Sequence, residues 1–172
     1  MPDFLEMKVA GIALDPANNA PIIILKDMEG RYVLPIWIGI MEASAIASSL
    51  EGIHYARPMT HDLFKSMVDS LGAKVEKIEV VDIRDNVFYA RITLELKGER
   101  HTIDARPSDA IAIALRTGSS IHVASHVVQE AVRVDTDKEP EGKVVVGFEQ
   151  DKDKLKEILE KMNPEDFGKF KA

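Results

Sequence analysis

The sequence predicts an α+β fold in which two antiparallel three-strand meanders form a mixed or antiparallel sheet, with helices packed between and around them. Short apolar or alternating segments come in groups of three joined by brief turns, and such connections make neighbouring strands antiparallel. Segments with apolar residues at helical spacing follow each group instead of alternating with single strands, as they would in a parallel βαβ fold. The chain has 172 residues, 45% of them hydrophobic, so it is large enough to bury a core.

The first meander begins the chain. Phe4–Asp15 is predicted as a strand, and the turn-forming run Asp15–Asn19 separates it from the next strand. Pro21–Lys26 is a short run of branched apolar residues, typical of a strand buried on both faces. After a second turn at Asp27–Gly30, a third strand over Tyr32–Ile38 completes the meander.

Two helices are expected between the meanders. The first, Ile40–Leu50, has apolar residues at helical spacing and ends before Gly52. The second runs from Thr60, which is a good N-cap residue, to Ser70.

The second meander repeats the pattern of the first. Its three predicted strands are Val75–Ile83, Val87–Lys97 and Arg100–Ala105, and their connections are short enough for hairpins. A helix from Pro107 to Arg116, closed by Gly118, follows this meander as Ile40–Leu50 follows the first one. A short strand and a further helix are then expected, at Ile121–Val123 and Ala124–Val132.

The chain is expected to divide into a domain over residues 1–134 and a tail over residues 135–172. The tail begins with a charged run containing Pro and Gly, which predicts an exposed loop. Val144–Phe148 is a candidate strand, and the apolar spacing of Asp151–Met162 predicts an amphipathic C-terminal helix. This helix packs on the main domain or lies at an interface with a partner subunit, and the sequence leaves both alternatives open. We expect a homodimer, with the strands Pro21–Leu25 and Tyr32–Ile38 and the tail helix as self-association surfaces.

Charge and cysteine content exclude several classes of protein. The chain carries 22 Lys and Arg against 29 Asp and Glu, and this net charge of -7 argues against non-specific coating of nucleic acid. The absence of Cys excludes a disulfide scaffold, a thiolate zinc site, an iron–sulfur cluster and a cysteine nucleophile. With no basic flank followed by an apolar run at the N-terminus, a cytoplasmic location is expected. Scarce Gln and Asn beside many Lys and Glu make the composition thermophile-like.

The segment Asp104–Ala110 (Asp-Ala-Arg-Pro-Ser-Asp-Ala) is the strongest candidate for a functional site. Alternation along a strand places Asp104 and Arg106 on one face. The following helix is apolar nearly all round and should be buried, which gathers these two residues with Ser108 and Asp109 at its N-terminus. Such a junction binds an anion through free N–H groups, or its carboxylates hold a divalent metal. Each residue also has a purely structural interpretation: Ser108 as a cap, Asp109 as a dipole partner, and Asp104–Arg106 as an ion pair.

Two further helix starts carry candidate groups. A second Arg-Pro pair at Arg57 precedes a helix whose first turn holds His61 and Asp62. These side chains are either a proton-transfer group and a metal ligand, or a surface residue and a partner of the helix dipole. Glu42 supplies another carboxylate, in the first turn of the helix that follows Gly39. If the three helix starts meet, their acids repel one another unless a cation lies among them.

Several motifs of the chain resemble the bifunctional nuclease domain family. They are Leu34–Gly39, Glu42–Ala43, Arg57–Leu63, Phe88–Ala90 and Ile103–Ala112, in matching order and spacing between Glu6 and Val132. The C-terminal Pro164–Phe167 also resembles the end of bacterial members. The resemblance implies hydrolysis of both DNA and RNA, a property attached mainly to plant relatives. It brings no settled catalytic mechanism, so the site residues are inferred from spacing and chemistry.

The sequence thus supports the hypothesis of a metal-dependent nuclease. The expected catalytic groups are Glu42, His61, Asp104 and Asp109, the phosphate-binding groups are Arg57, Arg106 and Ser108, and the ligands of Mg²⁺ or Mn²⁺ are Glu42, Asp62, Asp104 and Asp109. The alternative is a non-catalytic module that binds a small anion or assembles into a homo-oligomer. The acidic net charge, the few aromatic residues and the lack of a basic run favour this alternative.

Overall fold

The computed structural model of the chain describes residues 3–136. Its elements, in chain order, are β1 (Phe4–Leu14), β2 (Pro21–Asp27), β3 (Val33–Trp37), α1 (Ile40–Leu50), α2 (Thr60–Ser70), β4 (Lys74–Arg84), β5 (Val87–Leu96), β6 (Glu99–Ala105), α3 (Pro107–Thr117), β7 (Ser120–Ala124) and α4 (Ser125–Thr136). The predicted strand Val144–Phe148 and the predicted tail helix Asp151–Met162 lie outside the described residues.

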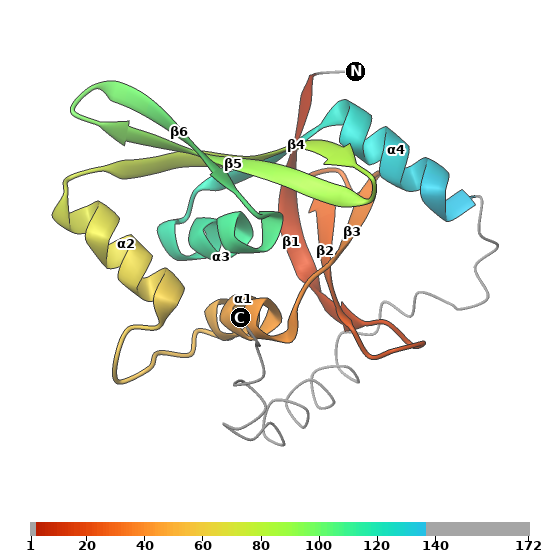
Figure 1. The fold of residues 1–172 in the computed structure, drawn as a ribbon, viewed down its shortest axis with the longest axis horizontal. Helices are drawn as coiled ribbons and strands as arrows, with labels where there is room; N and C mark the ends of the chain where they lie inside the picture. Colours follow the sequence, from red (N-terminus) through yellow and green to blue (C-terminus); the bar gives the residue numbers. More distant parts are fainter. Residues whose placement is uncertain (1–2, 137–172) are drawn as a thin grey trace.

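A single seven-stranded sheet contains both predicted meanders, with the strand order β3-β2-β1-β7-β4-β5-β6 (Figure 1). Each meander is antiparallel throughout, as expected from its short connections. The last strand, β7, lies between the two meanders, antiparallel to β1 and parallel to β4. The sheet is therefore mixed, and the prediction of an α+β fold is confirmed.

Helix α3 is the central helix of the molecule. It packs against β4, β5 and β7 and contacts both α1 and α2, while α4 packs on β3, β4 and β7 (Figure 1). The five residues Ala110–Ala114 are all buried, which matches the all-round apolar pattern of this segment. Gly118 ends the helix in the left-handed conformation with φ of 68°, a position that favours glycine.

The N-cap residues of two predicted helices differ from the observed ones. Thr60 is the first residue of α2, and the N-cap position belongs to Met59. The cap function comes instead from Asp62, whose Oδ2 accepts a hydrogen bond from the Met59 N–H at 3.0 Å. At the start of α3 the N-cap residue is Arg106, and Ser108 is a buried residue inside the first turn, so the interpretation of Ser108 as a cap is wrong.

No helix in the described part of the chain is long and apolar enough to cross a membrane. The core is shared by the sheet and its helices, and its largest fully buried side chains come from four strands and three helices. They are Ile23, Leu25, Leu34, Ile46, Ile78, Val80, Ile111, Val123, Val127 and Val128. Because α3 is enclosed between the sheet and its neighbouring helices, its first turn is held firmly in place.

Candidate functional site

The first turns of α1, α2 and α3 meet at one place on the molecule. Glu42 comes from the first turn of α1, His61 from that of α2, and Asp109 from that of α3, with Arg106 at the N-cap position of α3. We refer to these four residues as the helix-start cluster. They are linked in a chain of polar contacts, so the sequence-derived condition that the three helix starts meet is fulfilled.

Arg106 is the centre of this chain. Its Nη1 donates to Glu42 Oε1 at 2.8 Å, and its Nε donates to Asp109 Oδ2 at 2.8 Å. The other oxygen of Asp109, Oδ1, lies 3.0 Å from His61 Nε2. The cation that separates the acids is thus the protein's own guanidinium group, which two charge-assisted hydrogen bonds hold in place.

The four side chains differ in exposure, and Arg106 is the outermost. Its side chain is 65% exposed, whereas those of Asp109, Glu42 and His61 are 30%, 19% and 14% exposed. Burial alone would raise the pKa of Asp109, but hydrogen bonds from Arg106 and His61 outweigh this effect and hold that pKa below its usual range. Asp109 is therefore a carboxylate at neutral pH, and Arg106 has room to reach a ligand in solvent.

The contact with Asp109 determines the proton arrangement on His61. A carboxylate can only accept a hydrogen bond. Nε2 of His61 therefore carries a proton and donates a hydrogen bond to Asp109 Oδ1. In the neutral imidazole the other nitrogen, Nδ1, then has a free lone pair. An aspartate that fixes the tautomer of a histidine in this way is the arrangement found in many general bases.

Gly39 is part of the site although it has no side chain. It is the N-cap residue of α1, and a Cβ built on it would overlap Oε2 of Glu42. The Glu42 carboxylate therefore folds back over the start of its own helix into space that only glycine leaves open. The sequence pattern predicted Gly39 only as the residue before a helix; a glycine placed three residues before an acid is the signal for its role in the site.

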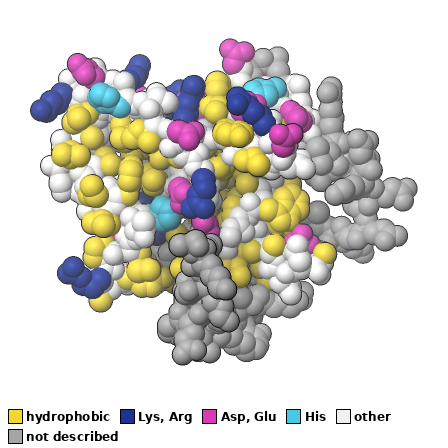
Figure 2. Space-filling view, viewed as in Figure 1, with side chains coloured by type: hydrophobic (Ala, Val, Ile, Leu, Met, Phe, Trp, Pro, Cys, Tyr) yellow, Lys and Arg dark blue, Asp and Glu magenta, His cyan; other side chains and the backbone are white. Residues whose placement is uncertain are grey.

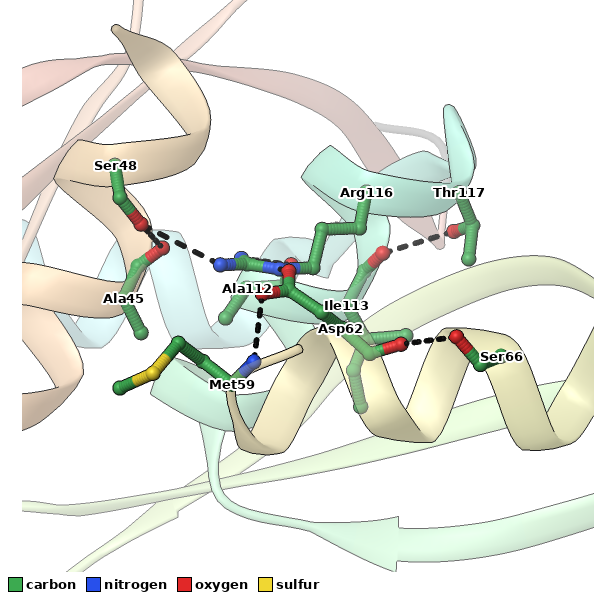
Figure 3. Close-up of polar contacts among 9 residues, drawn as sticks. All are labelled: Ala45, Ser48, Met59, Asp62, Ser66, Ala112, Ile113, Arg116 and Thr117. Atoms are coloured by element: carbon green, nitrogen blue, oxygen red, sulfur yellow. Dashed lines mark hydrogen bonds and ion pairs between the residues drawn. The ribbon is translucent and has the colours of Figure 1, made fainter. Parts of the chain in front are cut away.

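A second polar group, centred on Arg116, ties the same three helices together next to the cluster (Figure 3). Arg116 lies in the last turn of α3, and its side chain is only 8% exposed. Its Nε donates to Asp62 Oδ1 on α2, its Nη1 donates to the Ala112 carbonyl at 3.0 Å, and its Nη2 lies 3.5 Å from Ser48 Oγ on α1. Sequence reasoning did not identify Arg116, although a charged residue in so apolar a helix was a visible signal.

Asp62 belongs to this second group and not to the helix-start cluster. One of its oxygens accepts from Arg116 and the other from the Met59 N–H. The hydrogen bond from Arg116 is the main reason why the pKa of Asp62 is low, and it outweighs the opposing effect of burial. Asp62 thus anchors the first turn of α2, the turn that carries His61.

Asp104 is directed away from the cluster. It lies opposite Arg91 in the β5–β6 ladder, and Arg91 donates to Glu79 on β4 at 2.8 Å, so these side chains share one face of the sheet. The neighbours of Arg91 in the chain, Ala90 and Ile92, are buried in the core on the other face, where α3 packs. The expectation that Asp104 and Arg106 project from one face fails because β6 ends at Ala105 and the chain turns into α3.

The remaining predicted residues are placed as follows. Arg57 is exposed in the connection between α1 and α2 and makes no hydrogen bond or ion pair with the described residues. Ser108 is buried at 7% exposure in the first turn of α3. Among residues 3–136, no three histidine or acidic side chains lie close enough together to bind one metal ion. The predicted set of four metal ligands is therefore not gathered in this structure, and Glu42 and Asp109 are the two members that share a contact.

The surroundings of the cluster are largely apolar. Figure 2 shows acidic, basic and histidine side chains grouped near the middle of the face that carries α1, α2 and α3, with apolar side chains on several sides. Exposed apolar side chains from this part of the chain include Met41, Tyr55, Met59 and Leu63. A ligand of this site therefore meets one charged centre within an apolar surface, and not a stripe of Lys and Arg.

Comparison with known proteins places this geometry in context. Residues 23–135 match the family model described as bifunctional nuclease domain. An uncharacterized protein of Mycobacterium tuberculosis is 36% identical over 162 residues, which cover 94% of this chain and 97% of that protein. Bifunctional nuclease 2 of Oryza sativa subsp. japonica is 32% identical over 107 residues, covering 60% of this chain and 33% of the plant protein. Bifunctional nuclease 1 of Arabidopsis thaliana is 32% identical over 111 residues, covering 62% and 34%.

Proposed function

The chain belongs to the bifunctional nuclease domain family, and from that membership we propose that it hydrolyses phosphodiester bonds of DNA or RNA at the helix-start cluster. The plant proteins carry the name bifunctional nuclease, but the match covers only about a third of their length. The observation that carries the proposal is the linked chain of Glu42, Arg106, Asp109 and His61 at three helix N-termini. It combines a proton acceptor with a phosphate-binding group.

In this proposal Arg106 binds the scissile phosphate. Its side chain is 65% exposed, and the fork of N–H donors matches two phosphate oxygens. Carboxylates at Glu42 and Asp109 hold Arg106 in position before substrate arrives. The free N–H groups at the start of α3 add positive potential at the same place.

His61 is the proposed general base. A water molecule attacks the phosphorus atom, and His61 Nδ1 takes the proton of that water as the bond between oxygen and phosphorus forms. The bond from phosphorus to the leaving oxygen breaks, and solvent protonates that oxygen. Asp109 keeps His61 in the required tautomer and stabilises the imidazolium that results.

Dependence on Mg²⁺ or Mn²⁺ is a further part of the proposal. Mg²⁺ commonly binds through one or two protein carboxylates together with water and substrate phosphate, so a gathered set of four acids is not required. Glu42 and Asp109 are the carboxylates that would hold it, since they are the two predicted ligands within the helix-start cluster, whereas Asp62 belongs to the Arg116 group and Asp104 lies on the other face of the sheet. A bound cation would offset the repulsion between substrate and a chain of net charge -7.

The decisive experiment compares His61→Asn with a matched histidine variant. His101 lies on β6 with its side chain 51% exposed, away from the cluster, so His101→Asn is the control. Purified proteins are incubated with single-stranded DNA and RNA oligonucleotides, with Mg²⁺, with Mn²⁺ and with a chelator. We expect His61→Asn to lower the cleavage rate by about 100-fold or more and His101→Asn to leave it unchanged. Equal cleavage by the wild type and His61→Asn would contradict the proposal.

The alternative is a non-catalytic module that binds a small anion at Arg106. The exposed Arg106 side chain and the largely apolar surroundings of the cluster favour this alternative. Thermal denaturation separates the two functions, because a ligand of the folded state raises the melting temperature. Stabilisation by inorganic phosphate without a metal, together with no cleavage of either oligonucleotide, supports the module. A metal-dependent rise that Glu42→Gln abolishes supports the nuclease.

A further inference from the structure

Helix α2 carries a row of exposed apolar side chains along its length. Met59, Leu63, Met67 and Leu71 recur at intervals of four residues, and we refer to them as the α2 ridge. Their exposed fractions are 50%, 50%, 57% and 66%. Figure 2 shows apolar side chains gathered on the side of the molecule where α2 lies. A contiguous apolar patch of this kind marks an interaction site more often than a single exposed residue does.

The α2 ridge is not needed for the packing of α2 on its own domain. The residues that α2 turns toward the core are Val68, which is 6% exposed, and Phe64, which packs against the core from a partly buried position. His61, on the same helix, points to Asp109 on α3. Since α2 already has a buried face, the ridge is a second apolar face that no described residue covers.

We propose that the α2 ridge is the contact surface between two copies of this chain. Side chains spaced by four residues form one of the standard ridges of helix packing, and two such ridges interlock with the helices crossing at about -50°. Because the same ridge is present on both copies, a two-fold axis can place each ridge against its counterpart. This proposal does not depend on the nuclease function.

The size of the surface fits such an interface. The four side chains expose on the order of 400 Å², and one partner contributes about 800 Å² to a standard interface. Apolar atoms make up about 60% of the area of an interface. The apolar ridge together with the polar atoms around it therefore gives a total area close to the contribution of one partner.

The surface differs from those expected from sequence alone, of which Tyr32–Ile38 contains the edge strand β3 and stays a prediction. The apolar segment Pro21–Leu25 was a predicted self-association surface, but β2 is an interior strand paired with β1 and β3, and Ile23 and Leu25 are fully buried. That segment therefore has no free face or edge. The predicted tail helix lies outside the described residues.

The test uses the full chain and two substitutions of the same kind. Met67 is 57% exposed on the ridge, and Met28 is 60% exposed in the turn between β2 and β3, so Met67→Glu and Met28→Glu introduce the same charge at similar exposure. Size-exclusion chromatography with light scattering should give twice the chain mass of 19.1 kDa for the wild type and for Met28→Glu. For Met67→Glu we expect a monomer, with the dimer dissociation constant raised at least 100-fold.

A cross-linking experiment locates the interface independently. The chain has no Cys, so Leu63→Cys and Met67→Cys each create a single thiol. Under mild oxidation at least one of these variants should form a disulfide-linked dimer, whereas Met28→Cys should remain uncross-linked. A monomeric wild type at about 100 µM, as would follow if the C-terminal segment covers the ridge, overturns the proposal. A dimeric wild type also overturns the proposal if Met67→Glu leaves the dimer intact and neither ridge cysteine forms a cross-link.

Discussion

At the scale of single residues, the helix-start cluster shows how one guanidinium group compensates the negative charges of neighbouring acids. Glu42 and Asp109 were expected to attract a metal because like charges at meeting helix starts repel. Arg106 lies between them and provides the compensating charge at 2.8 Å from each. The pKa of Arg106 is raised by the hydrogen bond and charge of Asp109 and then by those of Glu42, so it remains a cation under all working conditions.

Gly39→Ala tests the placement of Glu42. The added Cβ overlaps Oε2 of Glu42, so the carboxylate must leave its position beside Arg106. Backbone φ of -74° at Gly39 tolerates alanine, and the effect should therefore come from the displaced side chain and the poorer cap. We expect a loss of about 1 kcal/mol in the free energy of unfolding, measured by urea denaturation.

A double-mutant cycle separates these two causes. In the Glu42→Ala background the overlap no longer exists, so Gly39→Ala should cost less than it does in the wild type. Equal costs in the two backgrounds would show that the Glu42 carboxylate does not occupy the space above Gly39.

At the scale of secondary-structure elements, Arg116 fastens α3 to both neighbouring helices. Arg116 contacts Asp62 on α2 and Ser48 on α1, and it also donates a hydrogen bond to the Ala112 carbonyl within α3 (Figure 3). Since Asp62 also caps α2, loss of Arg116 would loosen the turn that presents His61. Arg116 is in this sense a positioning residue for the proposed general base.

Arg116→Met tests this role. The substitution preserves much of the apolar stem but removes the donor that Arg116 supplies to Asp62 Oδ1 and to the buried Ser48 hydroxyl. We expect a loss of about 2–3 kcal/mol and a fall in melting temperature of roughly 4–12 °C. The control is Arg84→Met, which removes an ion pair with Asp82. The Arg84 side chain is 68% exposed. The control should lose no more than about 1 kcal/mol, and similar losses in both variants would argue against a special role of Arg116.

The elements themselves were largely predictable from sequence, whereas the site was predictable only where it depends on local pattern. Turn residues and helical spacing define the bounds of α1 and place both meanders correctly, because these signals act within a few residues. Asp104 was misplaced because alternation along β6 does not continue through the turn into α3. The pairing of Arg116 with Asp62 joins residues 54 positions apart, and no local pattern carries that information.

At the scale of the whole molecule, carboxyl groups in both meanders make the stability of the fold depend on pH. Several carboxyl groups in both halves have a pKa below the usual range. For Asp27 the main cause is the hydrogen bond from the Tyr32 N–H; for Glu79, contacts with Arg91 and Lys77 outweigh the opposing effect of burial. The folded state therefore releases protons that the unfolded state still binds at acidic pH.

Stability should consequently fall on acidification. Because the folded pKa values lie below the unfolded ones, about 3.9 for Asp and 4.3 for Glu, the stabilisation is fully present above pH 5 and is lost as pH drops through the folded values. Urea denaturation at constant ionic strength should give a lower midpoint at pH 3 than at pH 7. The pH dependence should be weaker in Glu79→Gln, since one of the groups that titrates is then missing. An unchanged midpoint between pH 7 and pH 3 would contradict this account.

The place of β7 in the sheet has a consequence for the order in which the chain folds. Residues 120–124 form the strand that lies between β1 and β4, so the two meanders have no direct strand pairing with each other. During synthesis both meanders precede β7, and each exposes an unpaired strand until that segment leaves the ribosome. Such late closure by a distant segment is slow and leaves open edges that attract other chains. We therefore expect the time between synthesis of residue 84, the end of β4, and insertion of β7 to be the interval in which both unpaired strands are open to aggregation.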